Sequence, residues 1–273
     1  MAAHSQEWLI NIFKSKKPIV GVIHLPPLPV SPTYSGDFKA VMRRCLTDAE
    51  ALEAGGVDGL IVENYGDAPF KPSRADPETV AAMSLLASET VKHCSKPIGV
   101  NILRNDAASA LAVATLAGGR FIRVNIHTGA ALTAEGLILG RSPETLRLRT
   151  LLKSDVKIFA DVSVKHSFLN IPQGLLYATL EATERGKADA LIVTGHRTGE
   201  PPALTEVKQV KKAAGETPVF VGSGLNPRNF EALLTHADGA IVGSYFKVGG
   251  ITTNPVDPER VKRFMEQVKA GFG

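Results

Sequence analysis

The segments PVFVGSG at 218–224 and ADGAIVGS at 237–244 decide the fold of this chain. Each is a short run of apolar residues that ends in glycine and serine, as expected of a parallel strand buried on both faces. In parallel α/β barrels, the turns after the last strands often form one phosphate-binding site, where a helix N-terminus adds partial positive charge. We therefore expect a phosphate group to contact Gly222, Ser223, Gly224, Gly243 and Ser244.

Further apolar runs recur before these segments, at 18–24, 57–64, 97–103, 120–125, 156–162 and 188–195. Helical patterns follow the runs, at 37–56 and at about 77–93, 106–117, 143–153, 172–185, 203–214, 227–235 and 257–271. Connections from helix to strand are short, whereas several from strand to helix are long and would gather at one rim. The alternation predicts a single α/β domain over 1–273, folded as a (β/α)8 TIM barrel with its site at that rim.

The N-terminal segment SQEWLINIFKSKK precedes the first predicted strand. Its apolar residues Trp8, Leu9, Ile12 and Phe13 recur at helical spacing. We expect a short helical extension at about 5–15 that covers the bottom of the barrel. Contact of this apolar face with a membrane is the alternative.

The composition excludes several classes of protein. The chain has 31 Lys and Arg against 27 Asp and Glu, a net charge of +4 that is scattered along the sequence. This mild excess suits an anionic metabolite, whereas a nucleic-acid-binding protein would show a concentrated basic face. No apolar run is long enough for a transmembrane span. Cys45 and Cys94 are expected to be reduced, buried thiols of a cytoplasmic protein.

Polar residues follow the predicted strands where each run ends, which is where a barrel places its site. The unperturbed pKa of histidine lies close to physiological pH, so His24 suits general acid–base chemistry. Glu63 and Asp161 could abstract a proton, bind Mg²⁺ or form structural ion pairs. The candidate catalytic residues are His24, Glu63, Asp161 and Lys165, and the candidate substrate-binding residues are Asn64, Asn101, Arg123, Asn125, Thr194 and His196.

The residues leave some roles open. Lys165 follows Asp161 by four positions, about 13 Å in an extended strand, so the two pair only if the chain curls. Lys165 could form a Schiff base, or it could be a solvated lysine. The candidates could also hydrogen-bond one another and the loop backbones. No motif specifies a divalent metal or another cofactor, so both stay unknown.

Long motifs spread over about 18–247 resemble the BtpA/SgcQ family: GVIHLPPLP, DGLIVENYGDAPF, GVNILRND, FIRVNIHTGA, FADVSVKH, GSGLN and DGAIVGS. The resemblance implies a TIM barrel related to the ribulose-phosphate-binding barrels. In cyanobacteria, the family's namesake is needed for biogenesis and stability of the photosystem I reaction centre and associates peripherally with thylakoids. Other members occur in non-photosynthetic organisms, and the resemblance supplies no set of catalytic residues.

Competing functions follow from these observations. The first is a cytoplasmic enzyme of isomerase, lyase or hydrolase type that acts on a phosphorylated, sugar-like metabolite. The second is a non-catalytic assembly or stability factor, which in a phototroph would lie peripheral to a membrane and bind a membrane-associated protein partner. Formation of a homo-oligomer is compatible with both. Nucleic-acid binding ranks last because the chain lacks a basic stripe.

Overall fold

The protein forms a closed parallel barrel in the computed structural model, which describes residues 4–162, 174–195 and 197–273. The strand order around the barrel is β1-β10-β9-β8-β7-β4-β3-β2. These strands are β1 (Ile19–His24), β2 (Gly59–Glu63), β3 (Ile98–Asn101), β4 (Phe121–Val124), β7 (Lys157–Asp161), β8 (Ala190–Val193), β9 (Val219–Val221) and β10 (Gly239–Val242). Each lies within one of the apolar runs, so the predicted TIM barrel is confirmed.

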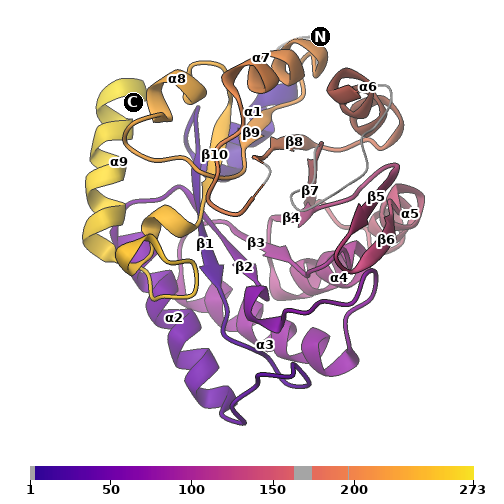
Figure 1. Cartoon of the computed structure of the whole chain (residues 1–273), viewed down its shortest axis with the longest axis vertical. Coiled ribbons are helices and arrows are strands. Elements are labelled where there is room, and N and C mark those ends of the chain that lie inside the picture. The colour runs from indigo at the N-terminus through magenta and orange to yellow at the C-terminus, as the bar shows by residue number, and fades with distance from the viewer. Residues whose placement is uncertain (1–3, 163–173, 196) are drawn as a thin grey trace.

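Helices surround the strands, as Figure 1 shows. They are α2 (Phe38–Ala54), α3 (Pro77–His93), α4 (Ala107–Ala117), α5 (Ser142–Leu151), α6 (Gly174–Leu180), α7 (Leu204–Ala213), α8 (Phe230–Leu234) and α9 (Pro258–Phe272). A π-helical turn (Glu181–Arg185) continues α6. Local chemistry sets the ends: the Asp37 and Asp106 side chains cap α2 and α4, and Gly118, at a φ of 84°, ends α4. Among the described residues, no helix is long and apolar enough to cross a bilayer.

An antiparallel hairpin, β5 (Ala130–Thr133) and β6 (Gly136–Leu139), interrupts the connection from β4 to α5. The sequence analysis treated this connection as a loop, and the structure corrects it. Ala131 and Ile138 pair across the hairpin and pack inward against Ile126, which gives it a small apolar core. The hairpin lies beside α5 in Figure 1.

Helix α1 (His4–Phe13) packs against the barrel interior at the amino ends of the strands. The Phe13 ring lies 5.5 Å from that of Phe121, 6.3 Å from that of Phe159 and 6.5 Å from that of Phe220, measured between centroids. Gly59 provides the space for this floor, since a Cβ there would lie 2.7 Å from Phe13 Cε1. The lumen is therefore filled at this end and open only at the other.

The cysteines lie outside the lumen as buried free thiols. Burial raises the pKa of Cys45 to about 11 and that of Cys94 to about 12. Both are protonated at neutral pH, and a protonated thiol is a poor nucleophile. Neither thiol is therefore a candidate nucleophile.

Candidate functional site

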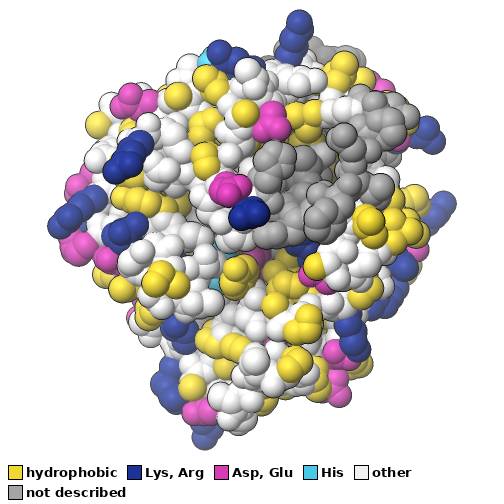
Figure 2. Space-filling view, viewed as in Figure 1, with side chains coloured by type: hydrophobic (Ala, Val, Ile, Leu, Met, Phe, Trp, Pro, Cys, Tyr) yellow, Lys and Arg dark blue, Asp and Glu magenta, His cyan; other side chains and the backbone are white. Residues whose placement is uncertain are grey.

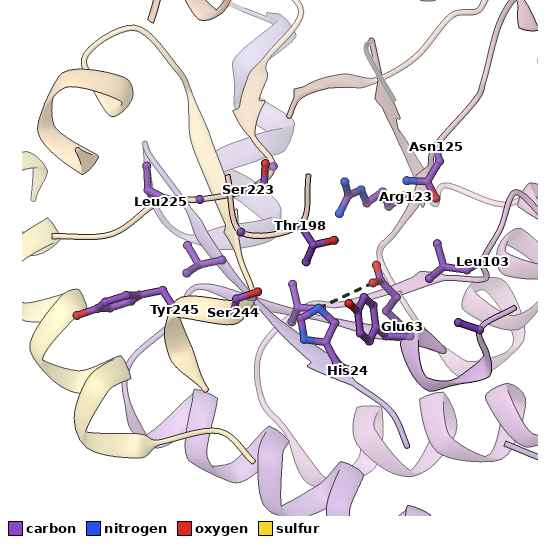
Figure 3. A pocket seen from close by; sticks show the side chains of 18 of the residues that line it. His24, Glu63, Leu103, Arg123, Asn125, Thr198, Ser223, Leu225, Ser244 and Tyr245 are labelled. Carbon is purple, nitrogen blue, oxygen red and sulfur yellow. Dashed lines mark ion pairs between the residues drawn. The ribbon is translucent and has the colours of Figure 1, made fainter. Parts of the chain in front are cut away.

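Strand periodicity places polar side chains above the phenylalanine floor. Every second residue of a strand faces the lumen, so His24 on β1, Glu63 on β2 and Arg123 on β4 point inward at the carboxyl ends. They line a cavity of about 490 Å³, together with residues of the long loops. Figure 3 shows this cavity from close by, with Arg123 and Asn125 across it from Ser223 and Ser244.

His24 and Glu63 form a buried acid–base pair. His24 Nε2 and Glu63 Oε1 are 3.9 Å apart, and the dashed line in Figure 3 joins the two side chains. Asn101 Nδ2 donates to Glu63 Oε2 at 2.7 Å, which orients the carboxylate. The His24 ring also meets that of Tyr65, with centroids 4.9 Å apart. A proton can therefore move between the imidazole and a bound ligand while Glu63 balances the charge.

Arg123, Asp161 and Asn125 form a second buried group. Arg123 donates from Nε and Nη2 to the two oxygens of Asp161, at 3.0 and 2.9 Å. Asn125 Nδ2 also donates to Asp161, at 3.0 Å. Burial alone would lower the pKa of Arg123, but Asp161 and, more weakly, Glu63 raise it. Asp161 thus forms the structural ion pair that the sequence analysis left as an alternative, and it holds Arg123 against the cavity.

The turns after β9 and β10 leave backbone N–H groups unpaired at one side of the cavity. Within the described residues, five N–H groups donate no hydrogen bond: those of Ser223, Gly224, Leu225, Ser244 and Tyr245. All of these residues line the cavity. Unpaired N–H groups at a concave surface favour an anion, which supplies the missing acceptors. We call this set of residues the N–H cradle.

The individual glycines and serines differ from the expectation in detail. The Gly222 N–H is already used, since it donates to Val193 O at 2.8 Å. The Ser223 hydroxyl is also committed, because it accepts from Gly195 N at 3.0 Å and donates to Glu200 O at 2.7 Å. The Ser244 hydroxyl shares a hydrogen bond of 2.7 Å with Thr252. The cradle therefore depends on main-chain groups more than on hydroxyls.

Space explains why glycine occupies these turns. A Cβ on Gly243 would lie 2.6 Å from His24 Cε1, so this glycine lets the imidazole stand beside the cradle. Gly224 has a φ of 67°, and a Cβ there would lie 2.1 Å from Pro201 N. Replacement of Gly224 must therefore disturb the fold, so it cannot serve as a clean test of ligand binding.

The expected contribution of a helix N-terminus after β9 is absent from the described structure. Helix α8 begins only at Phe230, and asparagine side chains accept hydrogen bonds from N–H groups of the turn before it. Asn226 N donates to Asn229 Oδ1 at 2.8 Å, and Arg228 N donates to Asn226 Oδ1 at 2.9 Å. These N–H groups already have acceptors, so they add nothing to the cradle.

Some predicted site residues lie outside the cavity or outside the described residues. The Asn64 amide donates to Asp67 at 2.9 Å and accepts from Leu103 N at 2.7 Å, because residue 64 faces away from the lumen when Glu63 faces into it. Thr194 is buried behind Gly222, where a Cβ would lie 2.9 Å from Thr194 Cγ2. Lys165 and His196 fall outside the described residues.

The cavity also has residues that the sequence analysis did not single out. Arg104 and Glu135 form an ion pair at 3.7 Å, with Glu135 carried by the turn of the unpredicted hairpin. Thr198 lies between Ser244 and Arg123 in the view of Figure 3. Tyr65 and Arg260 complete this group. None of these residues lies at the end of a barrel strand, and only that position predicts a site residue from the sequence.

Charged side chains are spread over the face of the molecule that Figure 2 shows. Lysine and arginine lie scattered around the face in Figure 2 and form no single basic patch there. Among the described residues, no group of His, Cys, Asp and Glu is arranged to hold a metal ion.

Comparison with known proteins agrees with this architecture. The model of the BtpA family matches residues 15–270. Photosystem I biogenesis protein BtpA of Synechocystis sp. is 45% identical over 264 residues, which cover 97% of this chain and 92% of that protein. An uncharacterized protein of Pyrococcus furiosus is 45% identical over 250 residues, which cover 91% and 93%.

Solved structures show the same fold at low identity. An archaeal fructose-1,6-bisphosphate aldolase, whose catalytic lysine is bound to a carbinolamine intermediate, aligns with a TM-score of 0.59. The alignment covers 99% of this chain and 100% of the aldolase at 17% identity. At that identity, the likeness supports the barrel and no particular reaction.

Proposed function

This chain belongs to the BtpA family, and from that premise we propose that its barrel is an enzyme that binds a phosphorylated, polyhydroxylated small molecule and moves a proton on it. The observation that carries the proposal is the N–H cradle in the same cavity as the pair of His24 and Glu63. A phosphate group would supply the acceptors that the cradle lacks. The unphosphorylated part of the ligand would then extend toward Arg123 and Asn125.

The lining of the cavity favours a ligand with hydroxyl groups. Glu63 and Glu135 offer carboxylate oxygens, which accept hydrogen bonds from hydroxyls. Arg123 remains charged in its pair with Asp161 and offers donors for a carbonyl or alkoxide oxygen. A hydroxylated chain that ends in phosphate satisfies both sides of the cavity, so a sugar phosphate is the ligand class that we propose.

The proposed chemistry is proton transfer at a carbon or hydroxyl close to the phosphate. His24 accepts or donates the proton, and Glu63, oriented by Asn101, stabilises the imidazolium. Arg123 stabilises negative charge that develops on an oxygen of the ligand. This assignment suits an isomerase, or a lyase that passes through an enolate. A Schiff-base mechanism like that of the similar aldolase would need Lys165, which lies outside the described residues.

A second candidate function is that of an assembly factor, favoured by the printed name of the Synechocystis relative. In that case the barrel would contact a membrane-associated protein in a phototroph. The Pyrococcus furiosus relative is also 45% identical to this chain, and its printed name gives no role in a photosystem. Under either function, we propose that the protein is cytoplasmic. In a phototroph that has such a partner protein, it would lie at the periphery of a membrane.

Ligand binding and turnover test the proposal together. Purified protein is screened by native mass spectrometry and thermal shift against a panel of sugar phosphates and the corresponding free sugars. We expect at least one phosphorylated compound to bind and its free sugar to fail. With a bound compound in hand, exchange of its carbon-bound protons with deuterated water is followed by NMR.

Matched variants assign the chemistry. We expect Glu63→Gln to slow proton exchange by about 100-fold or more, within the usual range for acid–base groups, and Glu231→Gln, on the exposed face of α8, to leave it unchanged. Binding without proton exchange in the wild type would favour the assembly factor. A protein that binds no phosphorylated compound would overturn the proposed function.

A further inference from the structure

We propose that Arg260 is the charged partner of the phosphate group in this site and that it selects a phosphomonoester dianion over a phosphodiester. The inference rests on the proposed function and names the ligand class of the same cavity. Arg260 belongs to the first turn of α9, remote in sequence from most of the cavity lining. No strand-end motif points to it.

Tyr245 holds the Arg260 side chain beside the N–H cradle. Arg260 Nε donates to Tyr245 O at 2.7 Å, and the guanidinium carbon lies 4.5 Å from the centre of the Tyr245 ring. The N–H of the same tyrosine belongs to the cradle. Both contacts therefore hold the guanidinium beside Tyr245, whose N–H group would bind the phosphate. Neither hydrogen-bonds the terminal nitrogens of the guanidinium.

The terminal nitrogens of Arg260 have no acceptor among the described residues. The other arginines that line the cavity differ, because Arg123 pairs with Asp161 at 2.9 Å and Arg104 with Glu135 at 3.7 Å. Arg260 is thus the cavity arginine for which the described chain supplies no carboxylate. A phosphate can accept from both terminal nitrogens in a bidentate arrangement.

The position of Arg260 in α9 supports an anionic partner. The start of a helix carries partial positive charge, so an arginine in the first turn is electrostatically unfavourable. Asp257 caps this helix, and its Oδ1 accepts from Glu259 N at 3.1 Å and from Arg260 N at 3.2 Å. That carboxylate serves the main chain of α9. A dianion in the cradle would balance the side-chain charge of Arg260 together with the unpaired N–H groups.

The test uses the smallest ligands that differ in phosphate charge. Methyl phosphate and dimethyl phosphate are titrated at pH 7.5 into wild-type protein, Arg260→Gln and Arg263→Gln, and amide chemical shifts report binding. Arg263 is exposed on the same helix and does not line the cavity, so its variant controls for the loss of one positive charge. Thermal unfolding without ligand reports whether each variant is folded.

We expect the wild type and Arg263→Gln to bind methyl phosphate with similar affinity and at least tenfold more tightly than dimethyl phosphate. Arg260→Gln should bind methyl phosphate about tenfold more weakly, the loss expected for a charged hydrogen bond. If Arg260→Gln is unfolded, Arg260→Lys is used in its place, since lysine keeps the positive charge without the bidentate geometry of arginine. Arg260→Lys should bind methyl phosphate at least about threefold more weakly than the wild type does.

The outcomes separate this inference from the proposed function. Equal affinity of wild type and a folded Arg260 variant, with clear binding by both, overturns the role of Arg260 and leaves the phosphate site intact. Equal affinity of the wild type for methyl and dimethyl phosphate overturns the dianion preference. A wild type that binds neither of these compounds nor any sugar phosphate overturns both the inference and the proposed function.

Discussion

At the scale of single residues, Asp161 is a candidate catalytic residue that the structure shows in a buried ion pair with Arg123. Its carboxylate accepts from Arg123 and Asn125 and does not line the cavity. The strand-end position that marked it as a candidate is correct, but its oxygens are used by neighbours on β4 and its connecting loop. These hydrogen bonds orient the Arg123 guanidinium beside the cavity, and Asp161 raises the pKa of Arg123.

Asp161→Asn should destabilise the fold strongly. The change deprives Arg123, whose side chain is 6% exposed, of the carboxylate with which it forms its ion pair, and such losses cost about 3–5 kcal/mol. Asp155→Asn is the control, since it removes a surface pair with Arg120 and should cost less than about 1 kcal/mol. Urea denaturation measures both. Similar losses in the two variants would contradict a structural role for the buried pair.

Lys247 forms a second buried ion pair, with Asp48, away from the cavity. Its Nζ lies 3.3 Å from Asp48 Oδ2, and its side chain is 0% exposed. Burial lowers the pKa of Lys247 to about 8, against the opposing effect of Asp48. Between pH 8 and 10.5 the unfolded chain therefore binds more protons at this group than the folded chain does. The contribution of Lys247 to stability is smallest below pH 8 and rises through this interval.

Comparison of Lys247→Met with the wild type isolates that contribution. The unfolding free energy of the wild type, minus that of the variant, should increase by up to about 3 kcal/mol between pH 8 and 10.5. Groups that titrate equally in both proteins cancel in this difference. Denaturation at several pH values measures it, and parallel stability curves for the two proteins would show that Lys247 keeps its ordinary pKa.

At the scale of elements, α1 closes the barrel from below. Phe13 and Trp8 contact lumen phenylalanines of the barrel, and the apolar spacing of the N-terminal segment was sufficient to place it there. Glycines on neighbouring strands leave room for these rings, as a Cβ on Gly99 would lie 2.2 Å from Phe121. The floor is thus a packed layer of large side chains against small ones.

Phe13→Ala should cost about 3–5 kcal/mol of unfolding free energy, because it removes a buried ring whose neighbours cannot collapse onto the space. Ile10→Ala, on the same helix with its side chain 43% exposed, should change stability by less than about 1 kcal/mol. Thermal and chemical unfolding compare the pair. A small loss for Phe13→Ala would mean that α1 is dispensable for barrel stability.

The sequence was informative about strands and less so about loops, for a physical reason. Lumen strands are continuous apolar runs, so their number and order could be predicted. The hairpin of β5 and β6 was not, since each strand is only four residues long and Leu137 and Leu139 are exposed on it. Cavity residues carried by loops or a helix start, such as Tyr65 and Arg260, have no local signal because only the tertiary fold brings them to the rim.

At the scale of the whole molecule, the barrel has a packed floor at one end of its axis and the cavity at the other. Among the described residues, the phenylalanine floor is apolar, and the cavity begins only above it, where His24, Glu63 and Arg123 lie at or near the carboxyl ends of their strands. The rim instead contains N–H groups for which the described residues supply no acceptor. Unpaired polar groups cost stability in the free protein, so binding of an anion should stabilise this end selectively.

Hydrogen exchange with and without methyl phosphate tests this separation over the whole chain. We expect the ligand to slow exchange at 223–225 and 244–245, where N–H groups gain an acceptor, by about fivefold to tenfold when the site is nearly saturated. Amides of the floor strands, such as those of Phe121 and Phe159, exchange through larger unfolding events. Their exchange rates should therefore change only by the amount that the ligand changes the global stability of the protein. Dimethyl phosphate at the same concentration is the control. Uniform protection across rim and floor would show that the anion stabilises the barrel globally and that the cradle is not where it binds.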